Sequence, residues 1–197
     1  MYCIDKNIES TYIIKKSKFI TKLYKVNSIE EVTDILNNLK DEYKDSTHIC
    51  YGYIVNELEK CFDDGEPSNT AGLPILNILK KNELNNVLCV VIRYFGGIKL
   101  GAGGLIRAYS NSTNEAVKKA TIVKQVPGYL VELEFSYDNL KTIDYILNSK
   151  EIISKEFNDS IIYKLILSEE EIKILKELER ICIHISIKDK ILINEKS

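Results

Sequence analysis

Hydrophobic residues along this chain follow two spacings, which predict strands and helices in alternation. In the first 125 residues, strands are predicted over 17–26, 47–56 and 87–95. Apolar residues in these segments either alternate with polar ones or form an unbroken run. Apolar residues that recur every three or four positions predict helices after Ser28, over 71–81 and over 103–120. Glu31, three residues after Ser28, completes the capping box that opens the first helix.

A second pattern begins after Val126-Pro127-Gly128, a cluster of residues that disfavour continuous secondary structure. Strands are predicted there over 129–135, 151–157, 160–167 and 182–188. Helices are predicted after Asp138 and after Ser168, and Asn158-Asp159 is typical of a hairpin turn. The order β-α-β-β-α-β is that of a ferredoxin-like sandwich. The sequence therefore predicts an α+β protein with two domains, 1–125 and 126–197.

Composition limits the possible classes of protein. The chain is 45% hydrophobic and 28% charged, as is usual for globular domains. No apolar run approaches the roughly 18–20 residues that span a bilayer, and the first ten residues lack a signal-peptide pattern, so we expect a cytoplasmic protein with no membrane partner. The five cysteines form no CxxC pair, which argues against a disulfide framework or a zinc site. We expect neither a metal nor a cofactor.

Charge is distributed unequally between the two halves. The net charge of −2 combines a balance of +2 in residues 1–125 with −4 in residues 126–197. Only the first domain is therefore expected to attract an anionic partner, and only locally.

The segment RYFGGIKLGAGGLIRAY, residues 93–109, holds five of the nine glycines. A strand, a glycine-rich turn and a helix amino terminus together favour binding of an anion. The nucleotide-binding fingerprints do not fit, however. A dinucleotide motif that starts at Gly101 would need glycine at Ile106, and a P-loop that starts at Gly96 would need lysine at Ala102.

Basic residues surround this turn, opposed only by Glu115. Arg107, Asn111, Asn114 and Lys118 recur at helical spacing and form one polar face, which suits a phosphate backbone or an acidic protein surface. A solvated helix whose glycines only permit close packing on the sheet is the alternative. The candidate phosphate or nucleic-acid contacts are Arg93, Lys99, Gly101, Gly103, Gly104, Arg107, Asn111 and Lys118.

The acidic loop DDGEPSNT offers the chemistry of an enzyme. Its candidate residues, Asp63, Asp64, Glu66, Ser68 and Thr70, fit either Mg²⁺ binding and acid–base catalysis or a rigid turn in which Ser68 or Thr70 caps the next helix. We expect this loop and the glycine turn to border one cleft. His48 and Cys50 share a strand face, where packing is the alternative to a catalytic pair. No motif assigns a catalytic residue.

Three separated motifs resemble the Impact/YigZ family: THICYGY at 47–53, DDGEPSNTAGLPIL at 63–76 and RYFGGIKLGAGGLIRAYSNS at 93–112. The resemblance implies a first domain similar to domain IV of elongation factor G, with a left-handed βαβ unit, and a second similar to domain V. It implies a translation-linked role near RNA or the ribosome, and eukaryotic members suggest a protein partner in translation control. Asn69 stands where the family is expected to have glycine, and asparagine tolerates a positive φ.

Two functions remain open from the sequence. The first is a translation-linked regulator that binds structured RNA or the ribosome through the basic, glycine-rich face. The second is an enzyme for a nucleotide or another small molecule, loosely like the GHMP kinases, that uses the glycine turn and the acidic loop. An RNA-recognition surface on the second domain is disfavoured, because Glu132, Glu134 and Lys164 stand where stacking aromatic residues are needed.

Overall fold

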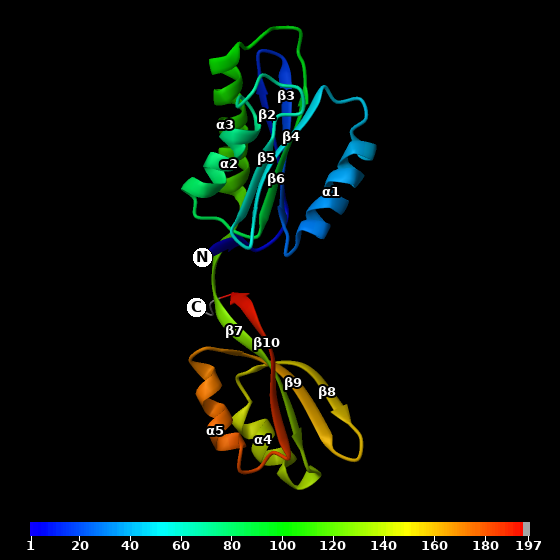
Figure 1. The fold of residues 1–197 in the computed structure, drawn as a ribbon, viewed down its shortest axis with the longest axis vertical. Coiled ribbons are helices and arrows are strands. Elements are labelled where there is room, and N and C mark those ends of the chain that lie inside the picture. Colours follow the sequence, from blue (N-terminus) through cyan, green and yellow to red (C-terminus); the bar gives the residue numbers. More distant parts are fainter. Residues whose placement is uncertain (195–197) are drawn as a thin grey trace. The chain divides into compact units, whose positions relative to one another are not determined.

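The computed structural model describes residues 1–194, which form two compact units, one of Met1–Lys124 and one that begins at Gln125 (Figure 1). Among these residues no helix combines the length and the apolar character needed to cross a bilayer. The elements of the first unit are β1 (Tyr2–Ile4), β2 (Ile8–Ile14), β3 (Ser17–Lys25), α1 (Ile29–Glu42), β4 (His48–Val55), β5 (Leu58–Phe62), α2 (Gly72–Lys81), β6 (Val87–Tyr94), α3 (Ala102–Lys119) and the start of β7 (Ile122–Phe135).

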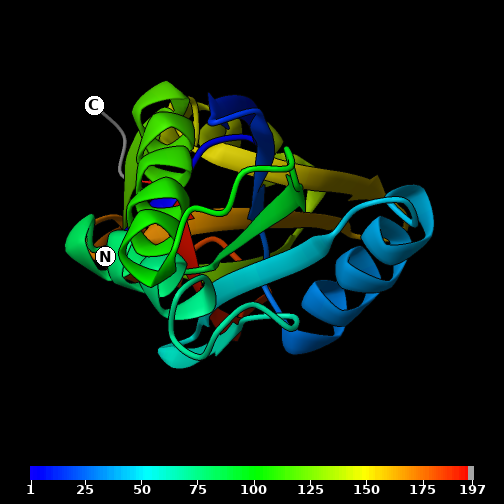
Figure 2. The ribbon, with the colours of Figure 1, turned by 90° about the horizontal axis from the view of Figure 1, so that it is seen from above.

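A five-stranded antiparallel sheet in the order β2-β3-β6-β4-β5 forms the centre of the first unit. The apolar run of β6 is buried on both faces, as predicted. Cys89 and Val91 pack in one cluster with residues of α2 and α3, whereas Val90 and Ile92 pack in another with residues of α1. Figures 1 and 2 show α1 on the opposite side of this sheet from α2 and α3.

The predicted helices of the first unit are confirmed, with their boundaries shifted by one residue or so. The capping box at the start of α1 is present: the Ser28 hydroxyl accepts from the Glu31 amide at 3.2 Å, and the Glu31 carboxylate accepts from the Asn27 amide at 2.7 Å. Leu105, Tyr109, Ser112 and Ala116 of α3 are buried against the sheet, as their spacing predicts.

The second unit has the predicted βαββαβ order. Its elements are the remainder of β7, a 3₁₀ turn (Tyr137–Asn139), α4 (Leu140–Ile146), β8 (Glu151–Phe157), β9 (Ile161–Ser168), a second 3₁₀ turn (Glu171–Ile174), α5 (Leu175–Leu178) and β10 (His184–Asn194). The strands pair antiparallel in the order β10-β7-β9-β8. Its core joins strand residues such as Phe135 and Tyr163 to Ile143 and Leu178 of the helices. The two-domain α+β fold class is thus confirmed.

Two local predictions in the second half were wrong. The strand predicted to begin after Val126-Pro127-Gly128 begins earlier, because β7 runs through these three residues and pairs there with β10. Pairing with β9 begins only at Gly128, so Pro127 has a strand neighbour on one side alone, where a missing N–H is tolerated. Asp138 does not cap the following helix either; it lies inside the 3₁₀ turn that precedes α4.

Candidate functional site

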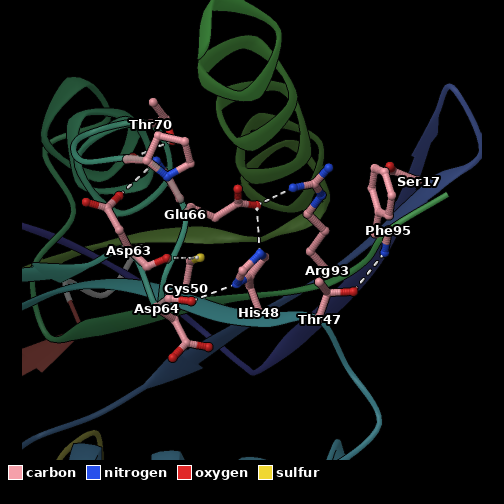
Figure 3. A network of polar contacts seen from close by, with 12 residues as sticks. Ser17, Thr47, His48, Cys50, Asp63, Asp64, Glu66, Thr70, Arg93 and Phe95 are labelled. Atoms are coloured by element: carbon pink, nitrogen blue, oxygen red, sulfur yellow. Dashed lines mark hydrogen bonds and ion pairs between the residues drawn. The ribbon is translucent and has the colours of Figure 1, made fainter. Parts of the chain in front are cut away.

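Several of the predicted site residues meet at one end of the first sheet, where β6 ends and β4 begins (Figure 3). His48 of β4 and Arg93 of β6 are paired in register, and Phe19 of β3 pairs with Arg93 from the other side. The loop between β5 and α2 brings Glu66 to the same place. Residues from four separate segments thus converge here.

Glu66 is the centre of a buried polar network. Its carboxylate oxygen Oε1 lies 2.5 Å from the Arg93 guanidinium and accepts from the Tyr109 hydroxyl at 2.8 Å. The His48 Nε2 atom lies 3.9 Å from the same oxygen. Only 3% of the Glu66 side chain and 6% of the Arg93 side chain are exposed. The Arg93 guanidinium is therefore buried and paired with Glu66 and is not a free cation at the surface, and its contact with a phosphate stays a prediction.

The other acidic side chains of the loop hold the backbone. The Asp63 carboxylate accepts from the amides of Asn69, Ala71 and Gly72 at 2.8–3.0 Å and so caps α2. Asp64 accepts from the Ile49 amide at 2.6 Å. These contacts favour the rigid turn, with Asp63 as the cap in place of Ser68 or Thr70.

Residues around this turn confirm its geometry. Asn69 has a φ of 61°, as its place in the motif predicted. The Thr70 hydroxyl donates to the Pro67 carbonyl at 2.6 Å, whereas Ser68 is exposed. Within residues 1–194 no group of three or more His, Cys, Asp or Glu side chains is arranged to hold a metal ion.

His48 and Cys50 face the same side of the sheet, but their contacts are structural. The His48 Nδ1–H donates to the Asp64 carbonyl at 2.7 Å, and the Cys50 thiol donates to the Asp63 carbonyl at 3.0 Å. Burial is the main cause that raises the pKa of the Cys50 thiol, and the nearby charge of Glu66 adds to it. A thiol that stays protonated is a poor nucleophile, which favours the packing interpretation.

Gly96 explains part of the glycine-rich turn. A Cβ at Gly96 would overlap the backbone of Lys16 and Ser17 in the turn between β2 and β3, and the Gly96 amide donates to the Ser17 hydroxyl at 3.2 Å. Gly101 has a φ of +73° and precedes the first residue of α3. Gly103, by contrast, faces open space: a Cβ there would meet only the end of the Arg107 side chain, at 3.8 Å. Close approach by the protein itself therefore accounts for Gly96 but not for Gly103.

Four exposed cations surround this turn, and we call them the basic rim: Lys15, Lys16, Lys99 and Arg107. None of the four has an ion-pair partner in the part of the chain that the structure describes. Lys15 and Lys16 both have positive φ in a two-residue hairpin turn, which Gly96 holds beside the glycine-rich segment. Sequence reasoning missed these two lysines, although the run KKSK before a predicted strand was a visible signal.

The remaining predicted contacts lie farther along α3. Lys118 is exposed, but its ammonium lies 2.9 Å from Glu115 and lowers the pKa of that carboxyl. The Asn111 side chain is also exposed and donates to the Tyr12 hydroxyl at 3.5 Å. Of these residues of α3, Lys118 has an acidic partner, whereas Arg107 has no ion-pair partner among the described residues.

A pocket of about 390 Å³ opens at this end of the helix. The acidic loop contributes Glu66 and Pro67 and the glycine turn contributes Lys99 to Ala102, so the two loops do border one pocket, as expected from the sequence. His48, Arg93 and Phe95 also line it. Gly101 offers no side-chain cap to α3, and the first turn of the helix holds no acidic residue. The pocket thus has mainly apolar walls and opens beside the uncapped start of α3.

Comparison with known proteins places the chain in a family. The family model of the Impact N-terminal domain matches residues 15–117, which include the whole basic rim. The IMPACT family member YvyE of Bacillus subtilis is 36% identical over 174 residues, which cover 86% of this chain and 80% of YvyE. YigZ of Escherichia coli is 31% identical over 161 residues, or 78% of this chain and 79% of YigZ. The chain therefore belongs to the IMPACT family.

A solved structure supports the fold over the full length. A crystal structure titled only as that of a hypothetical protein aligns with a TM-score of 0.66 and 26% identity, and it covers 99% of this chain and 97% of that one.

Proposed function

We propose that this protein is a translation-linked regulator that binds structured RNA, including ribosomal RNA, through the basic rim. The observation that carries the proposal is the grouping of Lys15, Lys16, Lys99 and Arg107 around the glycine-rich turn that leads into the uncapped start of α3, none of them in an ion pair with a described acidic residue. Membership of the IMPACT family supports the link to translation. The expected similarity of its first domain to domain IV of elongation factor G agrees with a role near the ribosome.

Phosphate groups suit this surface better than a neutral partner. Lysine and arginine side chains bind the backbone of nucleic acids by releasing counterions, and helix amino termini favour negative charge. Contacts of this kind position a protein without reading sequence. We therefore expect RNA binding that depends strongly on salt and weakly on sequence.

Contributions along α3 should be unequal. Arg107 and Lys118 are about 16 Å apart by helical rise, so they could reach phosphates several nucleotides apart. Glu115 already pairs with Lys118, however, whereas Arg107 has no such partner among the described residues. Replacing Arg107 should therefore weaken binding more than replacing Lys118.

The enzyme alternative is less well supported. It requires carboxylates that are available to a metal or a substrate, but Asp63 and Asp64 accept from backbone amides and Glu66 is paired with Arg93. Equilibrium binding of free nucleotides to the full chain separates the two functions, because the enzyme alternative requires such binding in the absence of RNA.

The experiment is a salt titration of RNA affinity, together with sedimentation of the full chain with ribosomal particles. The double variant Lys99→Ala/Arg107→Ala should bind more weakly and should flatten the plot of log affinity against log salt by about one unit per lost contact. The matched control is Lys40→Ala/Lys44→Ala, which removes an exposed lysine in the last turn of α1, on the other side of the sheet, and a second one just after the helix, where it pairs with the exposed Asp41. Parent-like affinity and salt slope in the rim variant would contradict the proposal.

A further inference from the structure

We propose that the pocket at the start of α3 binds one unpaired nucleotide of the RNA, with its phosphate at the amides of α3 and its base against Phe95. This inference rests on the proposed function and specifies the RNA: a hairpin with a bulged or overhanging nucleotide in place of a fully paired duplex.

The helix supplies the phosphate end of the site. α3 is 18 residues long, and its first turn begins at Ala102, Gly103 and Gly104. The amides of these three residues precede the first backbone bond of the helix, which runs from the Leu105 amide to the Gly101 carbonyl. No side chain caps them, and Gly103 leaves the approach open. Lys99, which lines the same pocket, adds a positive charge.

Arg93 provides an independent observation, a buried donor without a partner at the pocket. Its side chain is only 6% exposed, and one terminal nitrogen is paired with Glu66, yet its Nε–H has no hydrogen-bond partner among residues 1–194. Buried donors of this kind are normally satisfied, and Arg93 lines the pocket. A phosphate or base oxygen bound there would supply the missing acceptor. Because Arg93 balances the negative charge of Glu66, the charge of Lys99 makes the lining of the pocket positive overall.

Phe95 supplies the base end of the site. Its ring is 46% exposed and lies 5.5 Å from the Arg93 guanidinium (Figure 3). The Phe95 amide donates to the Thr47 hydroxyl at 2.9 Å, which fixes the backbone under the ring. Leu100, Leu105 and Pro67 form apolar walls. Unpaired bases in RNA complexes stack on exposed aromatic rings of this kind.

The size of the pocket selects the ligand. A volume of about 390 Å³ falls in the range of pockets for small organic groups, and a single nucleotide is of that size whereas a duplex is not. The basic rim lies next to this opening, so the same RNA can place its backbone on the rim and one flipped nucleotide in the pocket.

The test compares two fluorescently labelled RNA hairpins that differ only in one bulged nucleotide, titrated with the full chain. We expect the parent protein to bind the bulged hairpin roughly tenfold more tightly, the low to middle part of the range for stacking one base. Phe95→Ala should abolish this preference and leave the affinity for the paired hairpin unchanged. Phe62→Ala is the matched control, because Phe62 is equally exposed, at 46%, but lies on β5 outside the pocket.

A second pair of variants tests the phosphate end. Ala102 is the first helical residue, where proline is tolerated, so Ala102→Pro removes one amide donor without breaking α3. It should reduce the preference for the bulged hairpin several-fold. Gly103→Ala keeps its amide but places a methyl group on the open approach to these amides, so it should also reduce the preference while leaving the fold intact.

Three results would overturn the inference. If the parent binds both hairpins equally and with a steep salt dependence, the pocket takes no nucleotide, but the proposed function stands. If the parent binds neither hairpin, both fail. If adenosine or cytidine monophosphate binds alone and displaces neither hairpin, the pocket serves a free nucleotide and not RNA.

Discussion

Removing the Glu66 carboxylate should destabilise the first unit by about 3–5 kcal/mol, the usual effect of deleting one partner of a buried ion pair. Glu66→Ala would leave the Arg93 guanidinium, only 6% exposed, without its 2.5 Å partner. It would also remove the acceptor of the Tyr109 hydroxyl. Glu66→Gln retains an acceptor oxygen but not the charge, so it should cost about 1.5–3 kcal/mol, as for hydrogen bonds to charged groups.

Guanidinium chloride unfolding of the full chain, followed by far-ultraviolet circular dichroism, measures this effect. Glu66 lies in the first unit, so the transition of the second unit should not move. Glu115→Ala is the control for a surface pair, since Glu115 and Lys118 are both substantially exposed, and it should leave the midpoint unchanged within error.

A double-mutant cycle decides whether the network has been interpreted correctly. Replacing both partners, as in Glu66→Leu/Arg93→Met, removes the uncompensated buried charge and should therefore destabilise the protein less than the sum of the two single changes. A loss below about 1 kcal/mol for Glu66→Ala, or strict additivity in the cycle, would refute the reasoning, because either result would mean that solvent screens the pair.

Three further predictions concern the backbone, the thiols and the two units. Gly96→Ala should destabilise the first unit by more than about 2 kcal/mol, because its Cβ would overlap the backbone of Lys16. Gly103→Ala should be neutral or should stabilise the first unit by up to about 1 kcal/mol. The same unfolding assay measures both variants, and equal effects would contradict the packing described. Burial raises the pKa of the Cys50 thiol and raises that of Cys89 to about 12, so the folded state holds these protons more tightly than the unfolded state does. The free energy of unfolding should therefore fall as the pH rises above about 9, the ordinary thiol range, and a rise between pH 9 and 11 would contradict this sign. A fragment from Gln125 onward should unfold cooperatively by itself, since the core of the second unit draws only on its own residues, and a fragment without a thermal transition would argue for one continuous fold.

Local pattern was sufficient where an element is defined by neighbours in the sequence. The capping box of Ser28 and Glu31 and the continuous apolar run of β6 are signals within a few residues, and both predictions were correct. Strands β2 and β5 were missed because they are edge strands. β5 has four exposed residues out of five, so its sequence carries no clear alternation of buried and exposed positions.

The candidate site depended on contacts that no local window contains. From the sequence alone, Arg93 was a candidate phosphate contact and Glu66 a candidate residue of the acidic loop, with no link between them, whereas the fold pairs them across 27 residues and buries both. The contact of Gly96 with Ser17 spans 79 residues and brings Lys15 and Lys16 to the glycine turn.

The amino-acid sequence by itself determined the two-domain α+β class, most of the helices and central strands, the family and the position of the glycine-rich helix start, because each depends on periodicity or on a contiguous motif. Only the tertiary structure decided which charges remain free. Whether a lysine, arginine or carboxylate meets a partner depends on strand register and on the approach of distant loops, and those distances are set when the sheet assembles. The separation of the buried Glu66–Arg93 pair from the exposed basic rim is a consequence of that assembly.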